Sequence, residues 1–98
     1  MLGQKLRELR EAKGLMQRQV AAALEVDTAY VSKIESNEKP LSRGHLKKLS
    51  NLLDLPEDQL HTLWLADKLY DLAKDEQFGL QALEVAEEVL KTHRGEGR

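Results

Sequence analysis

Residues 17–36 read QRQVAAALEVDTAYVSKIES, and this stretch decides which fold the sequence predicts. Apolar residues recur at helical spacing over about 17–24 and again over about 28–35, with a break between the two segments. The consecutive alanines of the first segment favour a helix and leave room for a second helix to approach closely. Asp27 is a good N-cap for the second segment. The stretch therefore predicts two short helices joined by a tight turn, the second with a polar outer face.

The flanking sequence is also predicted to be helical, because leucines recur every three or four residues through most of it. The further helices are expected over about 2–13, 43–53, 56–74 and 80–91, with a break near DEQFG. No alternating strand pattern is found, so the fold class is all-α. We expect a five-helix domain over 1–66, a C-terminal helical extension over 67–92 and a flexible tail over 93–98.

The composition narrows the class of protein. The chain has 98 residues, of which 41% are hydrophobic and 33% charged, and it contains no cysteine. The absence of cysteine excludes disulfides, thiolate metal sites and a cysteine nucleophile. No apolar run approaches the roughly 20 residues that a membrane span requires, and the charged N-terminus is unlike a signal peptide. A cytoplasmic protein with no membrane association is expected.

Charge is distributed unevenly along the chain. Residues 1–50 contain ten Lys/Arg and six Asp/Glu, a net charge of +4, whereas residues 51–98 contain five and eleven, a net charge of −6. The formal total of −2 hides this asymmetry. A basic N-terminal half next to an acidic segment is typical of a protein that binds nucleic acid with one part only.

Two short helices joined by a three- or four-residue turn form the helix-turn-helix layout. Residues 2–60 resemble the Cro/C1-type (XRE) helix-turn-helix domain of phage repressors and bacterial regulators. The similarity rests on LRELREAKG, Gln17, Ala21, YVSKIE and LSRGHLKKLSNLLDL. VDTAYVSKIES is especially similar to controller proteins of restriction–modification systems. The resemblance implies a lambda-repressor-like domain and a transcription regulator or repressor with no cofactor, whose second short helix enters the major groove.

The resemblance also assigns roles to individual residues. Base contacts are expected from Thr28, Ala29, Ser32 and Lys33, since lysine donates to guanine, the threonine hydroxyl donates or accepts, and alanine offers a methyl group to thymine. Contacts with the DNA backbone are expected from Gln17, Arg18, Tyr30, Lys39, Ser42 and Arg43. Arg10 and Glu35 are expected to form a structural ion pair, as often occurs in this family. Three positions depart from the family pattern: Met16 stands where Ser or Thr caps the helix, Glu25 where glycine is common, and Glu38 is an acid in a loop that is expected to approach phosphate.

The last third of the chain is too apolar for a helix that lies alone on a surface. One interpretation packs its apolar residues back on the first domain; the one we favour places part of them in a two-fold homodimer interface. That predicted interface comprises Trp64, Leu65, Leu69, Tyr70, Leu83, Ala86, Val89 and Leu90.

Two other function classes are less well supported by the sequence. A protein-interaction module, such as an antitoxin whose C-terminal helices bind a second protein, is the main alternative. An enzyme is not expected, because no catalytic constellation or glycine-rich phosphate loop is found. A metal site is not expected either, since His45, His61 and His93 lack the close spacing of metal ligands.

Overall fold

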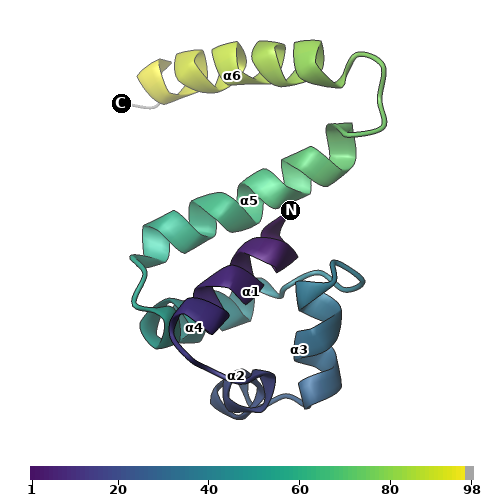
Figure 1. The fold of residues 1–98 in the computed structure, drawn as a ribbon. Coiled ribbons are helices and arrows are strands. Elements are labelled where there is room, and N and C mark those ends of the chain that lie inside the picture. The colour runs from purple at the N-terminus through teal and green to yellow at the C-terminus, as the bar shows by residue number, and fades with distance from the viewer. Residues whose placement is uncertain (97–98) are drawn as a thin grey trace. The chain divides into compact units, whose positions relative to one another are not determined.

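Six α-helices and one short 3-10 turn make up residues 1–96, the part of the chain that the computed structural model describes (Figure 1). The elements are α1 (Leu2–Ala12), α2 (Gln17–Leu24), α3 (Thr28–Glu35), the 3-10 turn η1 (Arg43–His45), α4 (Leu46–Leu53), α5 (Glu57–Ala73) and α6 (Gly79–Glu96). The predicted all-α class is confirmed. None of the helices described in residues 1–96 is long and apolar enough to cross a membrane.

The structure differs from the predicted helix bounds at two places. The fourth helix begins as η1, where the Ser42 hydroxyl accepts a hydrogen bond from the Gly44 amide at 3.3 Å, and only then continues as α4. α6 continues to Glu96, beyond the predicted end at about residue 91, so residues 93–96 of the expected flexible tail are helical. Residues 97–98 of that tail lie outside the described part of the chain.

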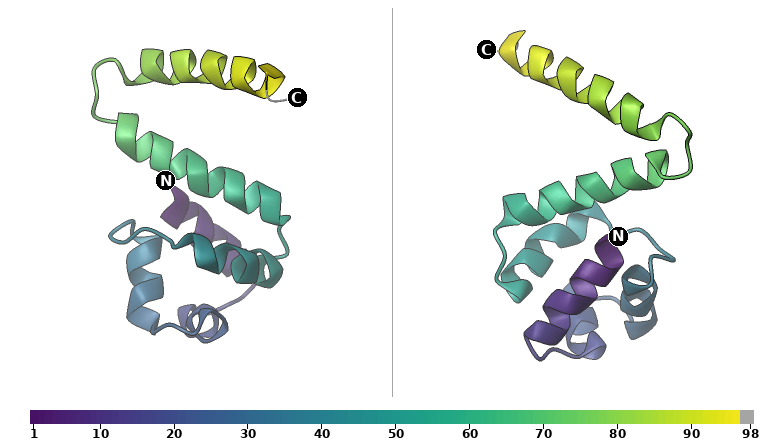
Figure 2. Two further views of the ribbon diagram at one scale, coloured as in Figure 1. Left: turned by 180° about the vertical axis from the view of Figure 1, so that it is seen from behind. Right: turned by 45° about the horizontal axis from the view of Figure 1, so that its top comes forward.

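The chain divides into two compact units, Met1–Asp67 and a second one that begins at Lys68, so the boundary falls within α5. In the first unit α3 packs against both α1 and α2, and α2 also packs against α4 (Figure 2). The core of this unit consists of Leu2, Leu6, Val20, Ala21, Leu24, Val31, Ile34, Leu41, Leu46, Leu49, Leu53, Leu60 and Trp64. Most of these residues lie at the positions where the helical spacing predicts an inner face.

The N-terminal end of α1 is held by two side chains that are distant in the sequence. The Asp67 carboxylate accepts a hydrogen bond from the Leu2 amide at 2.9 Å, and the Asn37 side chain accepts one from the Gly3 amide at 3.0 Å. A Cβ atom at Gly3 would lie 2.4 Å from the carbonyl oxygen of Ile34, so only glycine allows α1 to approach the end of α3 this closely. These contacts fix α3 relative to α1 and α5.

Trp64 lies in the core of the first unit and not on an exposed face. Its side chain is on the same side of α5 as that of Leu60, which lies one turn earlier, and both belong to the core. The indole Nε1 donates a hydrogen bond to the carbonyl oxygen of Leu41 at 2.6 Å. The tryptophan is only 8% exposed. The prediction that Trp64 belongs to a dimer interface was therefore wrong, because a side chain buried within its own chain has no surface left for a second copy.

The second unit contains the end of α5 and all of α6, and it buries little. Leu69, Tyr70, Val89 and Leu90 are exposed, Ala86 is exposed as well, and Leu83 is half-buried. Leu65, on the part of α5 that belongs to the first unit, is also exposed. The remaining residues of the predicted dimer interface are thus accessible in a single chain.

Candidate nucleic-acid interface

The turn between α2 and α3 is formed by residues 25–27. Glu25 has φ 60° and ψ 43°, the left-handed conformation that reverses the chain, and the Val26 amide donates to the carbonyl oxygen of Ala21 at 3.0 Å. Asp27 then caps α3, since its carboxylate accepts a hydrogen bond from the Tyr30 amide at 2.8 Å. At the other end of α2, Met16 offers no cap, but the Gln19 side chain accepts from the Met16 amide at 2.7 Å.

Replacing Glu25 with glycine is expected to raise the free energy of unfolding by about 0.5–1 kcal/mol, because a side chain in the left-handed region is strained and glycine is not. The carboxylate lies 3.2 Å from the Lys48 ammonium, but both groups are exposed and the pair adds little. Urea unfolding of Glu25→Gly measures the gain. Glu25→Ala is the control, since it removes the ion pair but keeps a Cβ; an equal gain in this variant would contradict the explanation from backbone strain.

The outer face of α3 is available to a ligand. Val31 and Ile34 are buried against the other helices, whereas Thr28, Ala29, Ser32 and Lys33 are exposed. Within the described chain the Lys33 ammonium makes no ion pair. The four residues predicted to contact bases thus share one solvent-facing surface, with a cation that is not neutralised by a neighbouring carboxylate.

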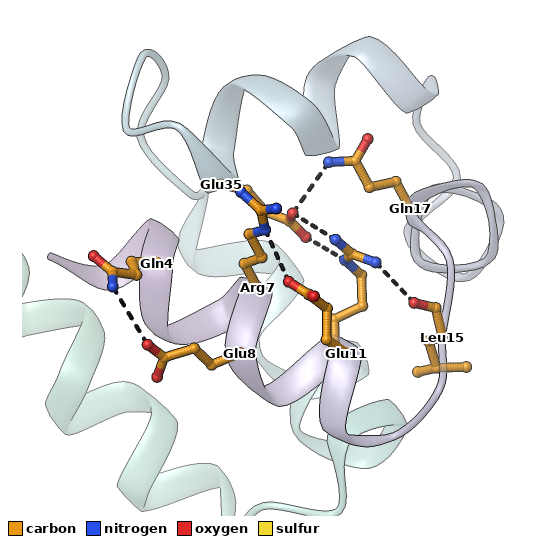
Figure 3. A network of polar contacts seen from close by, with 8 residues as sticks. Gln4, Arg7, Glu8, Glu11, Leu15, Gln17 and Glu35 are labelled. Atoms are coloured by element: carbon orange, nitrogen blue, oxygen red, sulfur yellow. Dashed lines mark hydrogen bonds and ion pairs between the residues drawn. The ribbon is translucent and has the colours of Figure 1, made fainter.

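A partly buried polar network joins this helix to α1 and α2 (Figure 3). The Arg10 guanidinium donates to both carboxylate oxygens of Glu35, at 2.7 and 3.0 Å, and to the carbonyl oxygen of Leu15 at 2.8 Å. The Gln17 side chain donates to Glu35 at 3.1 Å. The pKa of Arg10 is raised, chiefly by its hydrogen bonds with Glu35 and against the opposing effect of burial. The network fixes the last turn of α3 relative to the first turn of α2.

Residues 1–63 match a protein family described as a helix-turn-helix domain. The chain belongs to this family. Its helix-turn-helix domain binds DNA, since the second helix of this motif is the element that enters the major groove. The family is one of DNA-binding regulators and not of enzymes, which confirms both the resemblance that the sequence predicts and the expectation that the chain is not catalytic.

Two known proteins are similar to the helix-turn-helix domain. The HTH-type transcriptional regulator PrpR of Mycobacterium tuberculosis is 38% identical over 53 residues, which are 54% of this chain and 11% of PrpR. The crystal structure of the restriction–modification controller protein C.AhdI from Aeromonas hydrophila is 40% identical with a TM-score of 0.54, and the match covers 59% of this chain and 88% of C.AhdI. The chain thus spans about a tenth of PrpR but most of the controller protein.

A second group of predicted residues surrounds Tyr30 of the helix-turn-helix domain. The Lys39 ammonium lies 6.0 Å from the centre of the Tyr30 ring, and the His45 ring meets Tyr30 edge-on at 5.8 Å. The half-buried Tyr30 therefore connects two elements to the helix-turn-helix motif: the loop after α3, through Lys39, and η1, through His45. The sequence does not predict the contact with His45, because nothing in the local pattern brings residues 30 and 45 together.

The same region forms a shallow hollow on the surface of the domain. Its lining brings together four predicted site residues, Ala29, Tyr30, Lys33 and Lys39, with Val26 and Asp27. Two acidic groups lie in this part of the chain: Asp27 is the cap of α3, and the Glu38 carboxylate accepts a hydrogen bond from the Ser36 hydroxyl at 2.6 Å. The surface is therefore of mixed charge and not uniformly basic.

Arg43 is held apart from this hollow, over the ring of Trp64. Its guanidinium carbon lies 4.8 Å from the ring centre. Stacking occupies the flat face of a guanidinium and leaves the N–H groups in its plane free to donate. Arg18, on α2, is exposed and has no ion pair within the described residues.

The side chains of Gln17 and Ser42 each make one hydrogen bond within the chain, and each retains a hydrogen that can be donated to a ligand. The Gln17 amide nitrogen carries two hydrogens, of which one is directed to Glu35. The Ser42 oxygen accepts from Gly44, and its own hydrogen is available to an acceptor. No group of three or more His, Cys, Asp or Glu residues in the described chain could hold a metal ion.

Proposed function

We propose that this chain is a transcription regulator that binds double-stranded DNA sequence-specifically, as a cytoplasmic homodimer on a palindromic operator. The observation that carries the proposal is the outer face of α3, which is polar, exposed and free of carboxylate partners, while its inner face is buried and locked by Arg10 and Glu35. In this proposal residues 1–66 bind DNA and residues 67–92 form the dimer.

Sequence preference would come from a small set of side chains. Lys33 is the one long donor on the outer face of α3 and suits the O6 and N7 acceptors of guanine. Thr28 and Ser32 offer hydroxyl groups, and the Ala29 methyl suits the methyl group of thymine. Because the set is small, sequence-dependent DNA shape should contribute to the specificity.

Affinity would come from contacts with phosphate groups. Arg18, Lys39 and Arg43 supply charge, since none of them is paired with a carboxylate in the described chain. Gln17 and Ser42 supply the hydrogens that their internal contacts leave free, and Tyr30 positions Lys39. Such contacts position a protein on the duplex but carry no sequence information.

Lys33→Ala is expected to lose about 1–3 kcal/mol of binding to the preferred operator, and to relax the preference at one base pair. The operator is first obtained by selection from a random DNA pool. Affinities for that operator and for its single-base variants are then measured at fixed salt, by fluorescence anisotropy.

Arg18→Ala is the matched control for Lys33→Ala, because it also removes one exposed cation but from a residue assigned to the DNA backbone. It should weaken binding to all sequences alike and lower the slope of affinity against salt by about one unit. An unchanged base preference in Lys33→Ala would contradict its role as a base reader.

Two-fold symmetry explains how so few contacts could give useful affinity. A dimer would place two copies of α3 in successive major grooves, about 34 Å apart. The exposed apolar side chains of the second unit, such as Leu69 and Leu90, are the surface that supports a dimer. Solution mass, together with two protomers bound per operator, would establish it.

The alternative is a protein-interaction module of the antitoxin kind, and the same exposed apolar surface favours it. In that case the C-terminal helices would bind a different protein. A stable heterologous complex, combined with no salt-dependent DNA binding by the purified chain, would support this alternative and contradict the regulator.

A further inference from the structure

Trp64 contacts the segment between α3 and α4 at two points. Its indole Nε1 donates a hydrogen bond to the carbonyl oxygen of Leu41 at 2.6 Å, and the guanidinium carbon of Arg43 lies 4.8 Å from the centre of its ring. The ring is held in place, because it is only 8% exposed and the His61 ring meets it edge-on at 6.2 Å. Trp64 therefore presents a fixed aromatic surface to Arg43.

The Arg43 side chain is accessible and yet ordered. It is exposed, and within the described residues it makes no ion pair. A guanidinium within about 6 Å of a tryptophan ring centre is attracted to the negative face of the ring, and the 4.8 Å separation is well inside this limit. An exposed arginine without such a contact loses rotamer freedom when it binds a ligand. The ring thus lowers the entropy that Arg43 has to lose on binding.

The same contact suits a phosphate group as the ligand of Arg43. A stacked guanidinium uses its flat face and keeps its N–H groups in the plane, where two of them can donate to two oxygens of one phosphate. The hydrogen bond from the indole to Leu41 also holds the backbone two residues before Arg43. Both the backbone and the charged end of this arginine are therefore placed by one residue of α5.

We infer that Trp64 is a positioning residue for DNA binding, which holds the Arg43 guanidinium in place to contact a phosphate group of the DNA backbone. The inference rests on the proposed function and gives Trp64 a task in it besides its place in the core. Trp64 is buried and does not touch DNA itself. Because phosphate contacts carry no sequence information, loss of the ring should weaken binding to all DNA sequences alike.

A double-mutant cycle in the full-length chain tests the inference. The four proteins are the unmodified chain, Arg43→Ala, Trp64→Leu and the double variant, since leucine keeps an apolar side chain in the core but removes the ring. Dissociation constants for the selected operator are measured by fluorescence anisotropy at fixed salt, and circular dichroism gives the folded fraction for correction. Trp64→Leu should raise the dissociation constant about three- to tenfold. In the Arg43→Ala background the same change should have less than about a twofold effect.

Two controls separate positioning from a general effect on the fold. Arg18→Ala removes an exposed cation on α2, and its effect should multiply with that of Trp64→Leu. Trp64→Phe loses the hydrogen bond to Leu41 but keeps a ring beneath the guanidinium, so it should retain most of the DNA affinity although it is less stable.

Arg43→Lys tests the inference without any change in the core, so it is informative even if Trp64→Leu does not fold. Lysine keeps the charge but has no planar fork, and it should weaken binding about as much as Arg43→Ala does. An Arg43→Lys variant that binds like the unmodified chain overturns the inference.

The remaining outcomes distinguish this inference from the proposed function. A Trp64→Leu effect that is absent, or that persists in full when Arg43 is alanine, overturns the positioning role but leaves DNA binding intact. An unmodified chain without salt-dependent DNA binding overturns the proposed function, and the inference with it.

Discussion

Replacing Arg10 with methionine is expected to lower the free energy of unfolding by about 3–5 kcal/mol, because it leaves the Glu35 carboxylate without its cation in a largely desolvated place. The Glu35 side chain is only 7% exposed, and that of Arg10 12%. The substitution also removes the donor to the carbonyl oxygen of Leu15. Urea unfolding followed by circular dichroism measures the loss. A cost below about 1 kcal/mol would show that solvent reaches the pair, as at an exposed ion pair.

The matched control replaces both partners, Arg10→Met with Glu35→Leu. Apolar groups in place of both charges should recover most of the stability, since no charge is then left buried. The double variant still lacks the acceptor that orients Gln17. Weaker DNA binding at restored stability would therefore separate the contribution of the network to the interface from its contribution to folding.

Arg10 should not make stability depend on pH near neutrality. Its pKa is raised in the folded chain. A group with a raised pKa stabilises the fold fully below its ordinary pKa, and loses that contribution only as the pH rises through the raised value. For an arginine this range is strongly alkaline.

Trp64→Ala is expected to cost about 3–5 kcal/mol, the range for removing a large buried aromatic side chain. The substitution opens a cavity between α5 and the core, removes the hydrogen bond to Leu41 and takes away the ring on which Arg43 is stacked. Trp64→Phe keeps most of the volume but leaves the Leu41 carbonyl oxygen unpaired, so we expect a smaller loss of about 1–3 kcal/mol.

Leu65→Ala provides the contrast, because it changes the next residue of the same helix. Leu65 is 50% exposed, against 8% for Trp64. Its replacement should change the free energy of unfolding by no more than about 0.5 kcal/mol. Equal losses at the two positions would contradict the assignment of Trp64 to the core.

The helices, and most of the core of the helix-turn-helix domain, were predictable from the sequence. Both depend on the spacing of apolar residues that are near one another along the chain. Leu6, Val20, Val31 and Leu49 are buried where the 3–4 spacing places them. The caps are local as well: Asp27 and Ser42 bond amides two or three residues away. The outer face of α3 follows from the same spacing, since residues that are not on the inner face of an amphipathic helix remain exposed.

Contacts between distant residues could not be predicted in this way. Asp67 and Asn37 hold the start of α1 across long stretches of chain, and His45 meets Tyr30 from a different element. The pairing of Arg10 with Glu35 was expected from the resemblance and not from any pattern in the residues.

The sequence by itself determined which segments are helical, which face of each short helix is buried, and that α3 carries a polar outer surface. Periodicity encodes these properties, because neighbouring side chains on a helix share one face. Only the tertiary structure decided that Trp64 is core and Leu65 surface: α5 is apolar on more than one side, so its spacing does not indicate which side faces α1 and α4. The tertiary structure also showed that Asp67 caps α1. The sequence contains many carboxylates, and only the position of Asp67 beside the Leu2 amide distinguishes it from the others.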